Sequence, residues 1–81
     1  MKVEEIDVSA YSGYKLYEKP LKFIYKNEEF TIDKILSRST KDSFLNHKTQ
    51  HWFKVLCKNK KIFTIFYDIN QDKWFISLFP L

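Results

Sequence analysis

The sequence predicts a mainly β domain, either a small curved antiparallel sheet or an SH3-like barrel of about five to six strands. The main observation is that residues 52–79 form three aromatic, strand-like runs, separated by short polar breaks at 58–60 and 68–72. The middle run, 62–67, is apolar on both faces and therefore needs cover on both sides of the sheet. Closure into a barrel, a helix across the back or a partner subunit would each supply that cover.

The composition fits one domain over residues 1–81. Aromatic residues make up 19% of the 81 residues, which gives so short a chain enough bulk for a core. A single cysteine cannot form an intrachain disulfide, and the N-terminus lacks a secretory segment, so we expect a cytoplasmic protein. No apolar run reaches the roughly 20 residues of a membrane helix, so we expect no membrane partner.

The first quarter of the chain predicts a strand followed by an ordered loop. Residues 1–8 carry the apolar positions of a short strand, and residues 9–19 form the loop. The loop contains Gly13, the only glycine, which suggests a backbone position with positive φ or a close approach. We expect structural roles for Gly13, for its neighbour Tyr14 and for Pro20, which opens the next strand.

Residues 21–36 predict a hairpin, with its turn at 26–28 because asparagine tolerates the left-handed conformation of short loops. The same order of residue types recurs at 57–62 and predicts a second, similar turn. The polar stretch after residue 36 breaks the strand pattern. It leaves two interpretations open, a short helix near residues 40–48 or a polar excursion between strands.

No combination of residues predicts catalysis. His47 and His51 are four residues apart and would share one face of a helix. The nearest further ligands are Asp42 and Cys57, but Cys57 lies inside a strand and His51 opens that strand, so we predict no metal site. Cys57 lies inside a strand pattern, away from any helix N-terminus that would lower its pKa. One glycine excludes a glycine-rich phosphate loop. We therefore expect no catalytic residues, no cofactor and no enzymatic activity.

The net charge is +4, and a lysine cluster stands out within it. No acidic residue occurs between the first and last of its members, which are Lys54, Lys58, Lys60 and Lys61. Such a cluster can contact phosphate, or it can be a solvated hairpin end where lysines protect an edge strand.

The aromatic residues of the last three strands are too many for one small interior. Trp74 is expected in the core, whereas Trp52, Phe66 and Phe75 are candidates for a second surface. Three interpretations remain: a stacking platform for single-stranded nucleic acid, the anchors of a protein interface, or a core completed by the N-terminal tyrosines. We expect a non-catalytic binding module that acts by protein interaction or self-association through this aromatic meander. The alternative is a nucleic-acid-binding accessory domain that uses the lysine cluster beside exposed aromatics.

One resemblance adds to this interpretation. The loop and following strand resemble the opening of a family of short bacterial proteins of unknown function, in which a Y-S-G-Y-K-x-x-E-x-P-x-x-F pattern precedes a hairpin and a C-terminal meander. This chain departs from the family at Asn59-Lys60, where a glycine is usual, and in a longer excursion after Arg38. The resemblance implies one domain and no particular activity. The matching residues are Tyr11-Ser12-Gly13-Tyr14-Lys15, Glu18, Pro20, Phe23, Ile35-Leu36-Ser37-Arg38, Trp52-Phe53-Lys54-Val55-Leu56, Tyr67-Asp68 and Asp72-Lys73-Trp74.

Overall fold

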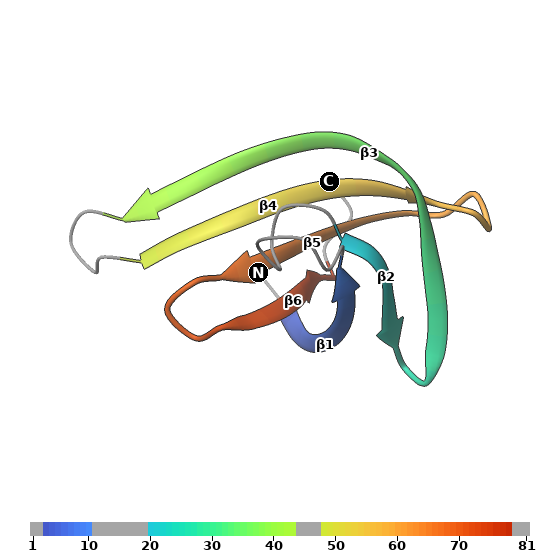
Figure 1. The fold of residues 1–81 in the computed structure, drawn as a ribbon, viewed down its shortest axis with the longest axis horizontal. Coiled ribbons are helices and arrows are strands. Elements are labelled where there is room, and N and C mark those ends of the chain that lie inside the picture. Colours follow the sequence, from blue (N-terminus) through green and yellow to red (C-terminus); the bar gives the residue numbers. More distant parts are fainter. Residues whose placement is uncertain (1–2, 11–19, 44–47, 79–81) are drawn as a thin grey trace.

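The protein is a closed barrel of six antiparallel strands, in which each strand pairs with its neighbours in sequence and the last returns to the first (Figure 1). The computed structural model describes residues 3–10, 20–43 and 48–78. The predicted mainly β fold and its closure into a barrel are confirmed. The strands are β1 (Val3–Ala10), β2 (Pro20–Tyr25), β3 (Glu28–Ser43), β4 (Lys48–Cys57), β5 (Ile62–Asp68) and β6 (Lys73–Ser77).

Some of the sequence-based predictions fall outside the described ranges. These are the positive φ of Gly13, the structural role of Tyr14, and the cover that the N-terminal tyrosines would give the sheet. Within the described ranges no residue is helical, so they contain no helix able to cross a membrane.

The barrel interior is an apolar core to which all six strands contribute. Trp74 lies in it, with its ring centroid 5.7 Å from that of Phe53 and 5.3 Å from that of Tyr67. Pro20, the first residue of β2, is also fully buried. The buried core residues are Ile6, Phe23, Phe30, Phe53, Val55, Cys57, Ile65, Tyr67, Trp74 and Ile76.

The two hairpin turns that share a sequence pattern have different backbones. In the β2–β3 turn, Lys26 and Asn27 both have positive φ, 52° and 62°, as a two-residue type I′ turn requires. In the β4–β5 turn, Lys60 has φ 73°, and its backbone N–H donates to the Cys57 carbonyl at 2.9 Å. This second connection is longer and ends in a left-handed residue, so the predicted similarity of the turns is wrong.

The strand β3 is sixteen residues long and extends to Ser43, into the segment where a helix or polar excursion was expected. Thr40 faces His51 and Asp42 faces Thr49 on β4. The Thr49 hydroxyl donates to Asp42 at 2.7 Å, and Thr40 Oγ1 lies 3.3 Å from His51 Nδ1. The helix predicted over 40–48 is therefore wrong for residues 40–43 and 48, which are in strands. Side chains that could cap a helix form hydrogen bonds between β3 and β4 instead.

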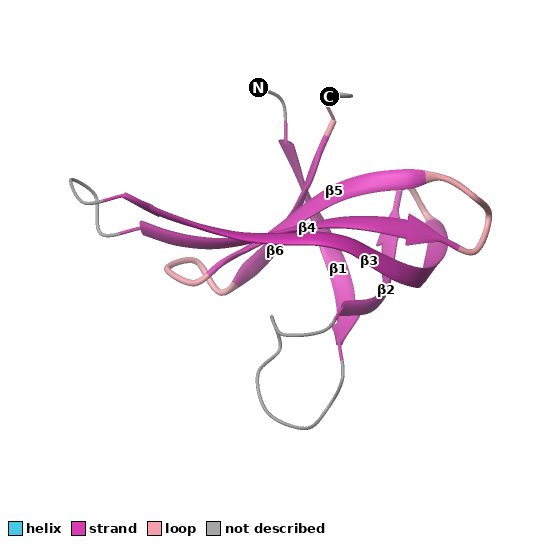
Figure 2. Ribbon diagram, turned by 90° about the horizontal axis from the view of Figure 1, so that it is seen from above, coloured by secondary structure: helices cyan, strands magenta, loops and turns pink. Residues whose placement is uncertain are grey.

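The β3–β4 hairpin extends beyond the other strands, as both ribbon views show (Figures 1 and 2). Near the barrel, its register shifts between Ile32 and Lys34 and again between Ile35 and Ser37. Each shift places two β3 residues against one β4 residue, which bends the strand. The bend lets β3 pair with β2 over its first part and with β4 over the rest.

Candidate interaction surface

The outer face of the sheet carries a second set of aromatic side chains. Trp52, Phe66 and Phe75 face one another across β4, β5 and β6, and we call them the aromatic row. The ring centroids of Trp52 and Phe66 are 4.3 Å apart and those of Phe66 and Phe75 are 5.2 Å apart, both pairs stacked. The Lys41 ammonium lies 4.1 Å from the Trp52 ring centroid. Phe66 is therefore stacked between Trp52 and Phe75, and Trp52 contacts both Phe66 and the Lys41 ammonium.

Burial matches this stacking. Trp52 is 8% exposed and Phe66 is 5% exposed, while Phe75 is half-buried. The aromatic row is thus mainly a structural layer outside the barrel, where stacked aromatic pairs stabilise the sheet by about 0.5–1.5 kcal/mol each beyond the area they bury.

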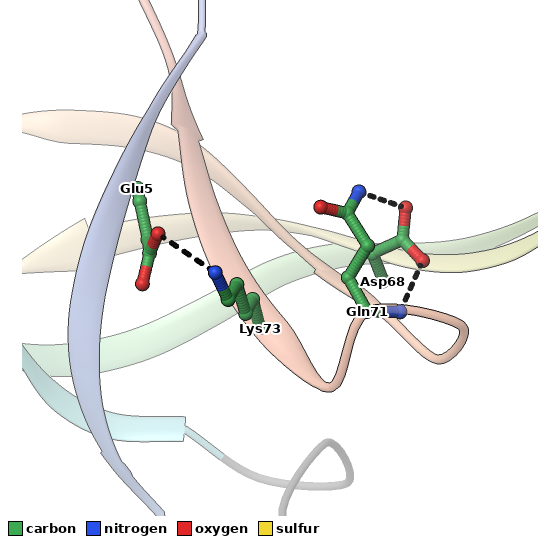
Figure 3. Close-up of polar contacts among 4 residues, drawn as sticks. All are labelled: Glu5, Asp68, Gln71 and Lys73. Atoms are coloured by element: carbon green, nitrogen blue, oxygen red, sulfur yellow. Dashed lines mark hydrogen bonds and ion pairs between the residues drawn. The ribbon is translucent and has the colours of Figure 1, made fainter.

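A chain of polar groups holds one end of the aromatic row in place. The Trp52 indole N–H donates to Gln50 Oε1 at 3.1 Å, and Gln50 Nε2 donates to Asp68 Oδ2 at 3.4 Å. Gln71 Nε2 donates to the same oxygen at 3.1 Å (Figure 3). The Gln50 amide cannot rotate by half a turn without losing its bond to Trp52, so the orientation of each group depends on its neighbour.

Asp68 is a buried carboxylate with an altered pKa. Burial alone would raise its pKa, but hydrogen bonds from Gln71, Gln50 and the Asn70 backbone favour the ionised form and lower the pKa overall. The backbone N–H groups of Asn70 and Gln71 donate to Asp68 Oδ1 at 3.0 and 3.2 Å. This carboxylate organises the turn between β5 and β6 and is not arranged for proton transfer.

Nearby, Glu5 of β1 and Lys73 of β6 form an ion pair of 3.5 Å at the seam that closes the barrel (Figure 3). About half of each side chain is exposed to solvent, so water screens the pair and its contribution to stability is small.

A different part of the outer face, next to the β4–β5 turn, exposes apolar side chains. Leu56 of β4 faces Ile62 of β5, and Leu36 is the extra residue at the second register shift of β3, opposite Lys54 and Val55 of β4. Ile62 is 53% exposed and Leu36 is 45% exposed, while Leu56 is half-buried. We call these three apolar residues and five exposed lysines the lysine-rimmed patch. The lysines are Lys34, Lys54, Lys58, Lys60 and Lys61.

The lysines of the patch come from β3, from β4 and from the β4–β5 turn. Lys34 faces Leu56 from β3, and Lys54 lies two residues before Leu56 on the same face of β4. The other three lie in the β4–β5 turn or next to it. All five are exposed, and none of them forms an ion pair with a carboxylate among the described residues. One acidic residue, Asp33, lies beside Lys34.

The structure brings the predicted binding residues together in two groups. Trp52, Phe66 and Phe75 form the aromatic row, and the four lysines predicted from sequence lie in the patch. Lys54 connects the groups, since it lies between Trp52 and Leu56 on the outer face. Sequence reasoning missed the apolar centre of the patch. The alternation of residues 62–67 did contain the signal, because it places Ile62 on the same face as Phe66.

No reactive centre is found in the described part of the chain. Cys57 is buried in the core, and burial raises the pKa of its thiol, so it is a poor nucleophile. Among the described residues, no three histidine, cysteine or acidic side chains are close enough to hold a metal ion. His51 bonds to Thr40, and His47 lies outside the described residues.

Comparison with known proteins adds no relative: no family model, curated protein or solved structure matches the chain. The resemblance inferred from the sequence pattern stays a prediction.

Proposed function

We propose that the protein is a non-catalytic binding module, and that it recognises a protein partner through the lysine-rimmed patch. The observation that supports this most directly is the exposure of Ile62 and Leu36 on a part of the sheet that carries five exposed lysines. Exposed apolar side chains gathered at one place on a small domain are typical of interaction sites. The aromatic row lies beside the patch on the same face of the sheet.

The patch also defines the chemistry of the partner. Its apolar centre favours an apolar side chain as an anchor, and its lysines favour acidic residues around that anchor. We therefore propose an acidic protein surface with an apolar centre. A single buried cysteine fits a reducing compartment, so the cytoplasm is part of the proposal.

A matched pair of variants tests this function. Ile62→Asp places a negative charge in the patch, and Ile24→Asp makes the same change on β2, where Ile24 is 46% exposed. In pull-downs compared quantitatively, we expect a partner to be retained by the wild type and Ile24→Asp and lost by Ile62→Asp. Identical sets of bound proteins for all three would contradict the proposal. Thermal melting of each variant checks that it folds.

A nucleic-acid-binding accessory domain is the second candidate, because five exposed lysines supply the charge that phosphate contacts need. Stacking on bases is less well supported, since the ring faces of Trp52 and Phe66 are taken by each other and by Lys41. Retention on heparin or on single-stranded DNA that falls steeply with salt and is lost in Lys58→Glu would favour this candidate. No retention on heparin or on single-stranded DNA, with a partner still lost by Ile62→Asp, would favour the protein partner.

A further inference from the structure

Among the residues that the structure describes, one edge of β3 has no pairing strand over most of its length. Residues Glu28 to Thr31 pair with β2, and from Ile32 onward β3 pairs with β4 on its other side. Within the described residues, no strand therefore lies against the β2-facing edge of β3 from Asp33 to Ser43. The ribbon shows this edge along the outside of the molecule (Figure 1). Its unused N–H and C=O groups are a template for a further strand.

The part of this edge with uninterrupted strand geometry begins after the second register shift. Beyond the second shift, Ser37–Ser43 pairs with Lys48–Lys54 without interruption. These seven residues span about 23 Å at roughly 3.3 Å per residue, which is the length of an ordinary strand. The segment contains neither proline nor glycine, the two residues that weaken strand pairing.

We propose that this edge pairs with the same edge of a second copy of the protein, antiparallel and centred on Thr40. The two sheets then become one continuous sheet across a two-fold axis. This goes beyond the binding function proposed above, because it uses the edge of β3 and leaves the lysine-rimmed patch free.

Charge complementarity selects the second copy as the occupant. Arg38, Thr40 and Asp42 lie on one face of β3, because they face Phe53, His51 and Thr49 on β4. All three are exposed. In the proposed register, Arg38 of each copy lies opposite Asp42 of the other copy, so the dimer gains two cross-strand pairs of opposite charge.

Other registers do not offer this match. A two-fold axis normal to the sheet pairs only residues whose side chains lie on the same face. Such residues are an even number of positions apart in the strand, so the axis passes beside a residue and not between two residues. An axis at Arg38 or at Lys41 places like charges against each other, and an axis at Ser39 pairs Arg38 with Thr40. The axis at Thr40 pairs both Arg38 and Asp42 with an opposite charge, and it sets Lys41 against Ser39. The charges therefore favour the axis at Thr40 over the neighbouring registers.

Charge reversal and its rescue test the proposal. Arg38→Asp and Asp42→Arg each turn both attractive pairs of the dimer into repulsive ones. The double variant Arg38→Asp/Asp42→Arg restores opposite charges with the partners exchanged. By sedimentation over a range of concentrations, we expect each single variant to weaken the dimer by about tenfold or more and the double variant to recover it.

Lys61→Asp is the control for surface charge in general. It alters the lysine-rimmed patch but lies outside the paired segment, so dimerisation should be unchanged. Loss of partner binding in Lys61→Asp with an intact dimer would separate the two proposals, as would loss of the dimer in Arg38→Asp with partner binding intact.

A cysteine scan tests the register directly. With the axis at Thr40, the two Cα atoms of Thr40→Cys face each other at about 4.5–5.5 Å, within disulfide range. In Ser39→Cys the two positions are about 7–8 Å apart, which is beyond that range. We expect an oxidised Thr40→Cys dimer and little from Ser39→Cys, while native Cys57 is buried and does not interfere. A wild type that stays monomeric at millimolar concentration, or equal cross-linking at both sites, would overturn the proposal.

Discussion

Removal of the Asp68 carboxylate is the sharpest test of how the outer face is held together. Asp68 is 1% exposed and accepts hydrogen bonds from Gln50, from the Asn70 backbone, and from both the backbone and the side chain of Gln71. A bond to a charged acceptor is worth about 1.5–3 kcal/mol. In Asp68→Ala, water can accept the hydrogen bonds of the exposed turn residues Asn70 and Gln71, but it reaches the Gln50 amide less readily. We therefore expect Asp68→Ala to lower the free energy of unfolding by about 2–3 kcal/mol.

Urea unfolding followed by tryptophan fluorescence measures this difference at neutral pH. A loss of this size corresponds to a fall in melting temperature of about 10–20 °C for a domain of this length. Asp33→Ala is the matched control, because Asp33 is exposed and bonds to no other described residue, so its cost should stay within about 0.5 kcal/mol. If Asp68→Ala were as stable as Asp33→Ala, the polar chain would have no role in holding the sheet.

The same carboxylate predicts a dependence on pH. The folded pKa of Asp68 is lowered from its ordinary value of 3.8, so its contribution to stability is present above that pH and is lost as pH falls through the folded pKa. The difference in stability between the wild type and Asp68→Ala should therefore shrink in acid. A difference that stays constant from about pH 7 to about pH 2.5 would show that the charged form is not the one the fold favours.

Two further substitutions test the barrel itself. Lys60→Gly should raise the free energy of unfolding by up to about 1 kcal/mol, because Lys60 has φ 73° and glycine adopts this conformation without steric cost. An unchanged urea midpoint would contradict the left-handed conformation of Lys60. Trp74→Ala should lower it by about 3–5 kcal/mol, because the ring is buried against Phe53 and Tyr67. A melting temperature close to that of the wild type would place the Trp74 ring outside the core.

The strands that alternate apolar residues could be predicted from sequence, and so could the closure of the sheet. Residues 62–67 are apolar on both faces, and the structure places Ile65 in the core and Phe66 in the aromatic row. Pro20 marked the start of β2 because a proline cannot donate to a central ladder. These features depend on residues that are close together in the chain, so they can be recognised from one sequence.

The far half of β3 could not be predicted, because residues 37–43 have no apolar alternation. Their strand conformation depends on pairing with β4, in which Thr40 and Asp42 bond to side chains that follow later in the chain. The binding surface was predicted only in part for a similar reason. Alternation shows which side chains share a face, but it does not show that Trp52 and Phe66 cover each other while Ile62 remains exposed.

The most direct test of the central claim is hydrogen–deuterium exchange of the purified protein, alone and with the partner that its patch retains. If the lysine-rimmed patch is the binding surface, slower exchange should appear in the β4–β5 turn at residues 58–61 and around Leu36, while the β2–β3 turn at Lys26-Asn27 is unchanged. Slower exchange at the β2–β3 turn with none at residues 58–61 would contradict the account.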